Sequence, residues 1–257
     1  MSNPLWAPLL AELDRWSAEG RRLQLWLRDD DAIAPSPQLD RLAALAEHFD
    51  APVLLAVIPF LAQSALCERL RSAPLLLPCQ HGAWHRNHAP QGEKKSEFGS
   101  HRPRDIIVAE IAAGRRRLMD LFGPTLLPVF VPPWNRIDRD IAAGLPELGF
   151  SGLSCFRNFG FAAPHGFSIV NTQIDIIDWH GGRIGRPTPA IAEEIVTELT
   201  RRREAGTGDS PLGLLLHHRD HDEGAWAVLD ALLGSIVHHP AVELVGLRQL
   251  FSGSNTA

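Results

Sequence analysis

The sequence of 257 residues contains no tyrosine, only two methionines and only three cysteines. The cysteines, at positions 67, 79 and 155, are odd in number and widely spaced, and no C-x-x-C pair is present. This pattern argues against a disulfide scaffold and favours a reducing compartment. No G-x-G-x-x-G segment follows the first strand-like run, so the dinucleotide-binding fingerprint is also missing.

Long apolar runs and long basic tracts are missing as well. The longest uncharged run, Ala51–Cys67, is too short to span a membrane and contains two prolines. The first residues lack the basic segment of a signal peptide and predict an amphipathic helix over about residues 4–19. The net charge of −5 argues against a nucleic-acid partner. We therefore expect a cytoplasmic protein without a membrane span.

Enough apolar sequence is present to build a sizeable core. Hydrophobic residues make up 45% of the chain and charged residues 21%, which excludes a disordered or collagen-like chain. The length lies between one and two domains of ~150 residues, but barrel folds use ~250 residues as one domain. Because neither a linker nor an internal repeat is evident, we predict a single domain over residues 1–257.

Short apolar runs that are typical of strands alternate with segments of helical periodicity. The strand-like runs are Leu23–Leu27, Val53–Ile58, Leu75–Cys79, Leu127–Val131, Gly152–Phe156, Ile169–Ile177, Leu212–Leu216 and Val242–Val245. The helix-like segments are Gln38–Phe49, Arg104–Phe122, Asp138–Leu148, Ala190–Arg203 and Glu223–Val237. This alternation predicts an α/β fold with a parallel sheet. The number of units favours a closed barrel over an open doubly wound sheet.

Polar clusters follow five of the strand-like runs. They are Arg28–Asp31, His81–His88, Pro132–Arg136, Asp175–His180 and His217–His221. Because the carboxyl ends of parallel strands share one face of the fold, we expect these clusters to converge there. The polar segment 81–104 has no clear periodicity, and a loop of that length is usually functional.

Two of these clusters carry residues that suit a metal site. Asp29, Asp30 and Asp31 repel one another, so packing them together requires a compensating cation or proton. The four-residue spacing of His81 and His85 can place two imidazoles on one face, and two histidines with a carboxylate form a catalytic metal arrangement. A solvated turn with exposed histidines is the alternative for each cluster taken alone.

The last cluster offers a candidate proton donor. His217 ends an apolar run, where an imidazole can serve as a general acid, although an isolated histidine at such a place is more often a core residue. His218 should point to the opposite side, because neighbouring strand residues alternate. We expect Cys79, two residues before His81, to be a buried strand-end residue instead of a metal ligand.

In this order, the blocks resemble the polysaccharide deacetylases of the NodB-homology type, which form carbohydrate esterase family 4. The matching blocks are Arg28–Ala32, His81 with His85, Val131–Trp134, Asp175–Trp179 and Leu214–His217. The resemblance implies a distorted (β/α)7-type barrel. It also implies a metal-dependent amide hydrolase that removes an acyl group, foremost acetyl, from the nitrogen of a sugar or sugar derivative.

The resemblance also implies roles for individual residues. Asp30 would be the catalytic base, and Asp31, His81 and His85 would hold one divalent metal ion, foremost Zn²⁺, with Co²⁺, Mn²⁺ or Ni²⁺ as alternatives. An alignment shifted by one residue, with Asp29 as base and Asp30 as ligand, remains open.

The remaining roles concern proton transfer and substrate binding. His217 would be the acid, Asp178 would orient it, and Trp179 would wall the pocket. The residues expected to line the substrate groove are Pro133, Trp134 and Asn135. Trp84 is equally compatible with sugar stacking and with packing.

The chain departs from the family pattern in two places. Val131 stands where the family has an arginine that pairs with the base, and Arg28, Arg136 or Arg157 are candidates to replace that charge. Residues 92–100 look like an insert over the pocket. This insert would read substrate through Lys94, Lys95 and Glu97, or would be a solvated loop.

Two other functions stay open at this stage. A hydrolase of the same fold that acts on a small non-glycan amide is favoured by the expected cytoplasmic location. A catalytically inactive sugar-binding module is favoured by the missing arginine at Val131. In each case the expected partner is a small-molecule or glycan substrate.

Overall fold

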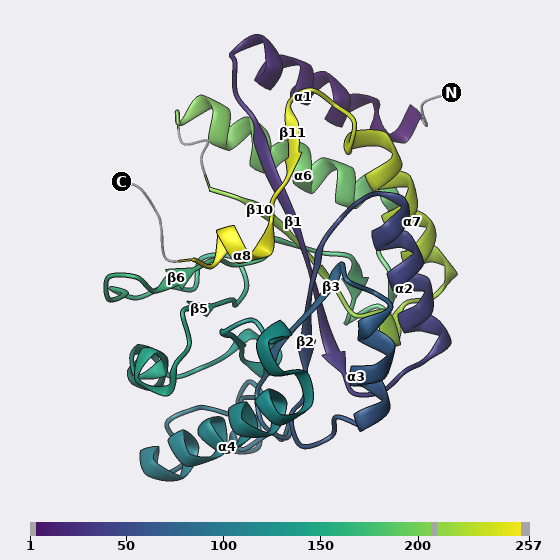
Figure 1. Cartoon of the computed structure of the whole chain (residues 1–257). Coiled ribbons are helices and arrows are strands. Elements are labelled where there is room, and N and C mark those ends of the chain that lie inside the picture. Colours follow the sequence, from purple (N-terminus) through teal and green to yellow (C-terminus); the bar gives the residue numbers. More distant parts are fainter. Residues whose placement is uncertain (1–3, 207–209, 253–257) are drawn as a thin grey trace.

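The computed structural model describes residues 4–206 and 210–252 (Figure 1). Its strands are β1 (Leu23–Ala32), β2 (Val53–Val57), β3 (Leu76–His81), β4 (Val129–Val131), β5 (Gly152–Leu153), β6 (Ser168–Ile169), β7 (Ile174–Asp175), β8 (Ile177–Asp178), β9 (Ile184–Gly185), β10 (Leu212–Leu216) and β11 (Val242–Leu244). Its helices are α1 (Ala7–Ala18), α2 (Pro37–His48), α3 (Ser64–Arg71), α4 (Arg104–Phe122), α5 (Arg139–Ala143), α6 (Thr188–Glu204), α7 (Glu223–Ile236) and α8 (Leu247–Leu250).

The main sheet is parallel and has the strand order β6-β5-β4-β3-β2-β1-β10-β7, with β11 added beside β1. One continuous segment supplies both ends of this order: β6 pairs with β5, and β7, which four residues separate from β6, pairs with β10. The backbone between them bonds to both neighbours: Thr172 N–H donates to the Cys155 carbonyl, and Gln173 N–H donates to the Gly213 carbonyl. The sheet therefore curls on itself, and the predicted distorted (β/α)7-type barrel is confirmed.

Helices α2 and α7 begin where the sequence provides a side-chain cap. Ser36 accepts a hydrogen bond from Leu39 N–H at the start of α2, where Pro37 occupies the first helical position. Asp222 caps α7 in the same way, by accepting from Ala225 N–H. Both helices turn an apolar stripe toward the sheet, and this burial holds them in place.

Two predicted elements are interrupted. The run Ile169–Ile177 is not one strand but contains parts of β6, β7 and β8. The segment Asp138–Leu148 holds the short helix α5 and a separate 3-10 turn, Leu145–Leu148, because Pro146 lacks the N–H that a continuing helix would need. Helix α3 was missed, since its eight residues give too few turns for a clear periodicity.

The two predicted segments outside the barrel are found. A 3-10 turn, Pro4–Trp6, and α1 form the N-terminal helix, which contacts α6 through the Trp16 indole N–H and the Leu199 carbonyl at 3.3 Å. Segment 82–103 contains no helix, and one isolated bridge, between Phe98 and Ile137, ties it to the chain beyond α4.

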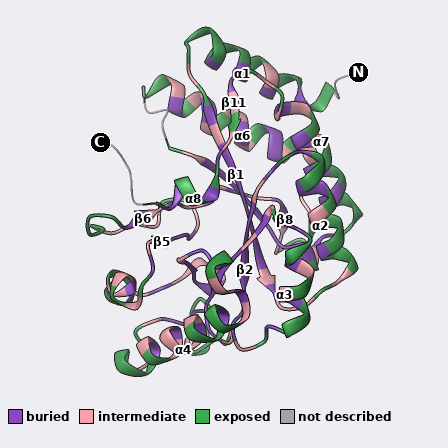
Figure 2. Ribbon diagram, viewed as in Figure 1, coloured by how far each residue is buried: buried purple, intermediate pink, exposed green. Residues whose placement is uncertain are grey.

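The core lies between the sheet and its surrounding helices. Figure 2 shows buried residues along the strands and on the inner faces of the helices, with exposed residues on the outer faces. Strands β2 and β10 are buried at every position, as expected for parallel strands covered on both sides. Among the described residues, no helix is both long and apolar enough to cross a membrane.

Candidate active site

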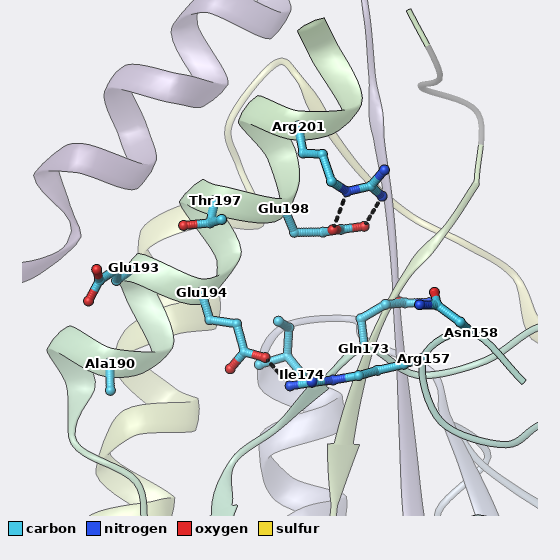
Figure 3. A pocket seen from close by; sticks show the side chains of 10 residues that line it. All are labelled: Arg157, Asn158, Gln173, Ile174, Ala190, Glu193, Glu194, Thr197, Glu198 and Arg201. Atoms are coloured by element: carbon cyan, nitrogen blue, oxygen red, sulfur yellow. Dashed lines mark hydrogen bonds and ion pairs between the residues drawn. The ribbon is translucent and has the colours of Figure 1, made fainter. Parts of the chain in front are cut away.

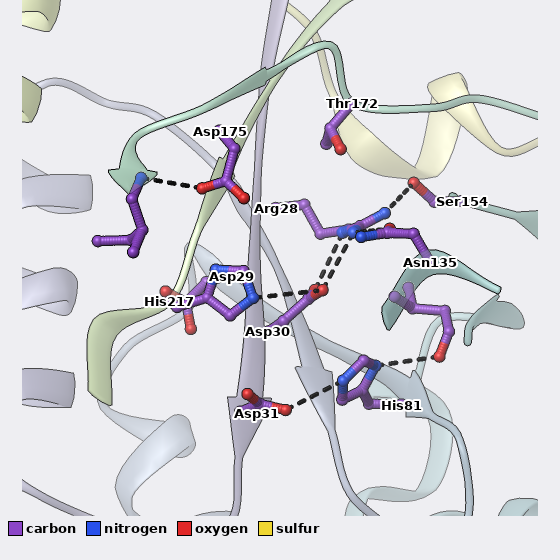
Figure 4. A network of polar contacts seen from close by, with 12 residues as sticks. Arg28, Asp29, Asp30, Asp31, His81, Asn135, Ser154, Thr172, Asp175 and His217 are labelled. Atoms are coloured by element: carbon purple, nitrogen blue, oxygen red, sulfur yellow. Dashed lines mark hydrogen bonds and ion pairs between the residues drawn. The ribbon is translucent and has the colours of Figure 1, made fainter. Parts of the chain in front are cut away.

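The three consecutive aspartates at the end of β1 point to different places. In a regular strand Asp29 and Asp31 would share one face, but the pairing register with β2 shifts between Asp29 and Ala32. Asp31 also adopts the left-handed conformation, with φ of 72°. This bulge turns the carboxylate of Asp31 away from that of Asp29 and toward β3 (Figure 4).

Asp29 is engaged by the residue after His217. Both Asp29 and His218 are buried. One carboxylate oxygen of Asp29 accepts from His218 N–H at 2.7 Å, and the other pairs with Nδ1 of the His218 ring. His217 and His218 therefore do point to opposite sides. Because Asp29 is occupied in this way, the geometry favours Asp30 and Asp31, not Asp29 and Asp30, as the functional pair.

Asp31, His81 and His85 come together as a candidate metal site. Their ligand atoms all lie within 4.8 Å of one another. Asp31 Oδ1 is 3.1 Å from His81 Nε2 and 3.2 Å from His85 Nε2. The histidines are not on a helix: His81 ends β3, and His85 follows in a turn with φ of 57°.

The donor set fits a divalent transition metal. One carboxylate and two imidazoles are the ligands of open catalytic zinc sites. His81 Nδ1–H donates a hydrogen bond to the Val131 carbonyl at 3.0 Å. With the proton on Nδ1, Nε2 carries the lone pair that can bind a metal. The Cys79 side chain is buried, and burial raises the pKa of its thiol well above the usual range. It is not part of the cluster, in agreement with the prediction.

Charge is concentrated at this cluster. Burial opposes ionisation of Asp31, but the hydrogen bond with His81 and the neighbouring histidine charges outweigh it and hold the pKa of this carboxyl far below its ordinary value. Burial also disfavours the charged His81 ring, yet Asp30 and Asp31 raise its pKa. Burial and the His81 charge lower the pKa of His85. The cluster thus combines a fixed negative charge with imidazoles whose protons a metal cation can displace.

Arg28 supplies the charge that Val131 lacks. Its Nε forms an ion-pair contact with Asp30 Oδ1 at 2.9 Å, and its Nη2 donates a hydrogen bond to Asp30 Oδ2 at 3.0 Å. The guanidinium therefore contacts both carboxylate oxygens. The Arg28 side chain is fully buried and also donates to Ser154 and to the Cys155 carbonyl. The other two candidates lie elsewhere: Arg136 donates to the Lys95 carbonyl, and Arg157 pairs with Glu194.

His217, the residue after β10, faces Asp30. Its Nε2 lies 4.0 Å from Asp30 Oδ2, and the Trp179 ring meets its imidazole edge-on at a centroid distance of 4.6 Å. The ring is buried, and its Nδ1 has no hydrogen-bond partner among the residues that the structure describes. His217 can therefore reach the same space as Asp30 and the Asp31–His81–His85 cluster.

The structure does not bring Asp178 to His217. Asp178 Oδ1 instead accepts from the N–H groups of His180 and Gly181, at 3.0 and 2.7 Å, and closes the turn between β8 and β9. Asp175 is the other carboxylate of this block; burial raises its pKa, and the His217 charge opposes that shift. Its Oδ2 accepts from the Trp179 indole N–H at 2.8 Å. Asp178 is thus not placed to orient His217, whereas Asp175 contacts the His217 ring indirectly, through Trp179.

The expected groove residues have mixed positions. Trp134 is half-buried, in a left-handed conformation, with its ring 4.4 Å from the His85 ring, so it does wall the site. Pro133 is buried against Gly82. Asn135 Oδ1 accepts from Arg28 Nη2 at 2.5 Å, which commits that oxygen to holding Arg28 and not to substrate.

The insert is neither a solvated loop nor a substrate reader as a whole. Glu97 is fully buried and accepts hydrogen bonds from backbone N–H groups of the His81–His85 turn and its flank, so its predicted contact with substrate is wrong. Lys94 and Lys95 are exposed, and Lys95 Nζ lies 5.9 Å from the Trp134 ring. Trp84 stacks on Phe60 at 4.4 Å, which supports the packing alternative.

A groove of about 700 Å³ lies apart from this cluster, along α6 (Figure 3). Its charged lining is largely paired within itself. Arg201 donates to both oxygens of Glu198, and Arg157 pairs with Glu194. Of the arginines considered as replacements at Val131, only Arg157 lies here, and none of the predicted metal or proton-transfer residues does.

Comparison with known proteins shows which solved structures have a similar fold. No protein-family model and no curated protein sequence matches the chain. A Mycobacterium smegmatis protein assigned to the polysaccharide deacetylases superposes with a TM-score of 0.58 at 18% identity, over 83% of this chain and 75% of that one. A family 4 carbohydrate esterase from Streptomyces lividans, in complex with acetate, gives 0.53 at 13%, over 85% and 90%.

The third comparison limits what the fold can decide. A mutant of a pseudoenzyme of carbohydrate esterase family 4, with restored activity, gives a TM-score of 0.58 at 13% identity, over 90% of this chain and 68% of that one. The chain thus has the fold of the polysaccharide deacetylases, as its sequence blocks indicated. Because the same fold is found in pseudoenzymes, function must be argued from the residues of the site.

Proposed function

We propose that this protein is a metal-dependent hydrolase that removes an acyl group, foremost acetyl, from the amide nitrogen of a sugar or sugar derivative. One observation carries the proposal: the buried carboxylate of Asp30 lies between a candidate metal cluster and the ring of His217 (Figure 4). A base, an acid and a set of metal ligands are the groups that metal-assisted amide hydrolysis needs. The acetate-bound esterase of the same fold supports acetyl as the acyl group.

Asp31, His81 and His85 would hold the metal, Zn²⁺ foremost. When bound, the metal supplies Lewis-acid activation of the acyl carbonyl and of water. The chain contributes the orientation of the ligands. The Val131 carbonyl fixes the His81 tautomer, and the Trp134 ring packs against His85.

Asp30 would take the proton from the attacking water. Arg28 holds both oxygens of its carboxylate, so the base has one fixed orientation and its buried charge is compensated. Asn135, Ser154 and the Cys155 carbonyl in turn fix Arg28. This network removes the main support for an inactive binding module, which was the missing arginine at Val131.

His217 would protonate the leaving amine from Nε2. Its ring lies on the opposite side of Asp30 from His81. Asp175 and Trp179 would hold that ring in place, since Asp175 fixes the indole and the indole meets the imidazole edge-on. A half-buried Trp134 and Trp179 would flank the reacting group.

Acetate release from acetylated chitooligosaccharides tests this proposal. The metal-loaded protein should release acetate, and Asp30→Asn should lower the rate by about 10²- to 10⁴-fold. The same assay with small amides separates a sugar deacetylase from a non-glycan amide hydrolase of the same fold. Turnover of neither substrate class by metal-loaded protein would contradict the proposal.

A further inference from the structure

Glu97 is buried at the centre of the turn that carries the second candidate metal ligand. The turn runs from His81 to Arg86, and the Glu97 side chain is 0% exposed. Its Oε1 accepts from Trp84 N–H at 2.7 Å and from Arg86 N–H at 3.4 Å, and its Oε2 accepts from Ala83 N–H at 3.2 Å. One carboxylate therefore gathers the backbone on both sides of His85.

The part of the chain that the structure describes supplies no cationic side chain to this buried carboxylate. Among the ion pairs of the described residues, none involves Glu97. Three backbone N–H groups that converge on an anion form a nest, which is how loops usually bind phosphates. Here a side chain of the same protein occupies the nest. Burying a charge this way is costly unless such bonds are made, so the turn and the carboxylate depend on each other.

The turn conformation needs that support. His85 has φ of 57°, which is unfavourable for a residue with a Cβ, and Gly82 has the same φ. A Cβ at Gly82 would lie 2.3 Å from Glu97 Oε2 and 2.6 Å from the Pro133 ring. The turn thus packs closely around the carboxylate. Position 82 requires glycine because a side chain there would collide with Glu97.

Glu97 is itself held by the insert around it. His88 N–H donates to the Ser96 carbonyl, and Ser96 N–H donates to Asn87 Oδ1, each at 2.9 Å. On the other side, Asp138 N–H donates to the Phe98 carbonyl at 2.8 Å. The carboxylate therefore has a fixed position on which the turn can be built.

We propose that Glu97 is a positioning residue for the metal site: it fixes the left-handed turn that presents His85 Nε2 to Asp31 and His81. This inference rests on the metal site of the proposed function. It adds that the affinity of that site depends on a carboxylate that contacts neither metal nor substrate. The insert 92–100, which lies outside the family pattern, thereby becomes part of the site's construction.

Metal affinity of the metal-free protein tests this directly. Zn²⁺ dissociation constants are measured by competition with a chromophoric chelator, and the Co²⁺ absorption spectrum reports the coordination. We expect Glu97→Ala to weaken Zn²⁺ binding by about 100-fold and Glu97→Gln by about tenfold. The glutamine keeps one oxygen for Trp84 and Arg86 N–H but loses the acceptor for Ala83 N–H. Glu93→Gln is the matched control, because Glu93 is an exposed carboxylate of the same insert.

The outcomes separate this inference from the proposed function. If wild-type protein binds no Zn²⁺, the metal site and the proposed function fail together. If wild type binds and folded Glu97→Ala binds equally tightly with an unchanged Co²⁺ spectrum, only the role of Glu97 is refuted. Circular dichroism of the metal-free variants shows whether each is folded. Should Glu97→Ala not fold, Glu97→Gln decides, since wild-type affinity in that variant would refute the role.

Discussion

Arg28 and Asp30 stand two residues apart on one strand and form a fully buried, two-point ion pair beside the candidate metal site. Residues at this spacing share one face of a strand, so the backbone alone brings the guanidinium and the carboxylate together. The arginine that the family pattern places after the fourth strand is thus replaced from the first strand. Asp30, the proposed base, thus has a cationic partner although Val131 carries no charge.

We expect Arg28→Met to destabilise the protein by about 3–5 kcal/mol, because it leaves the buried Asp30 charge without its partner. Urea denaturation of the metal-free protein measures this. Arg28→Met combined with Asp30→Leu, which removes both charges, should recover part of the loss. Wild-type stability in Arg28→Met would show that the ion pair does not compensate the buried carboxylate.

Replacing His217 should separate proton donation from metal binding. We expect His217→Ala to lower kcat by about 10²- to 10⁴-fold, since the leaving amine loses its acid. Its metal content per chain should equal that of wild type, because His217 is not among the three candidate ligands. Elemental analysis and turnover are measured on the same preparation. Loss of metal in this variant would contradict the division of roles.

The two aspartates of the D-x-x-D-W block should differ in effect. We expect Asp175→Ala to lower kcat by about tenfold or more, because the Trp179 indole loses its acceptor and the contact with His217 loosens. Asp178→Ala should leave kcat within about twofold of wild type. It should lower the free energy of unfolding by about 1 kcal/mol, since it loses only the hydrogen bonds of the turn. Steady-state kinetics of the pair checks this. A larger loss for Asp178→Ala would restore its originally expected role.

Stability at acid pH should depend on His221. Burial lowers the pKa of His221 from 6.5 to about 4, an effect that Asp29 opposes and the His217 charge reinforces. Between these values the unfolded chain binds a proton that the folded chain does not, so lowering the pH favours unfolding. The loss is fully present below about pH 4 and amounts to about 3 kcal/mol.

His221→Gln serves as the comparison, because glutamine can still accept the His217 N–H that His221 Nε2 accepts at 3.3 Å. Urea denaturation of the metal-free proteins at several pH values between 4 and 7 gives the two slopes. Wild type should lose more stability than the variant as the pH falls. Equal slopes would mean that His221 titrates normally in the folded protein.

Much of the fold could be predicted because strands such as β2, β4 and β10 are apolar at every position and the main helices have clear apolar stripes. The sequence alone could not decide between Asp30 with Asp31 and Asp29 with Asp30 as the functional pair, because a single bulge at Asp31 reverses the alternation. In the same way, Asp175 and Asp178 are separated by a break between β7 and β8 that their spacing does not reveal. The open choice between the two aspartate pairs and the misplaced role of Asp178 both concern register, which depends on backbone details below the level of residue patterns.

Glu97 was misjudged for a different reason. A charged residue in a polar segment is usually solvated, and the partners of Glu97 are backbone N–H groups, which leave no signal in the side-chain sequence. Arg28 was considered as the partner of the base, but three arginines were compatible with the sequence. Only the folded strand shows that Arg28 alone of these reaches Asp30.

Metal content per chain tests the central claim most directly. Protein purified without chelator is analysed for zinc, cobalt, manganese and nickel, beside His81→Ala prepared in the same way. The account predicts about one divalent ion per wild-type chain and its loss from the variant, since three ligands converge on one position. A wild-type protein that holds no metal, and takes up none when Zn²⁺ is added back, would contradict it.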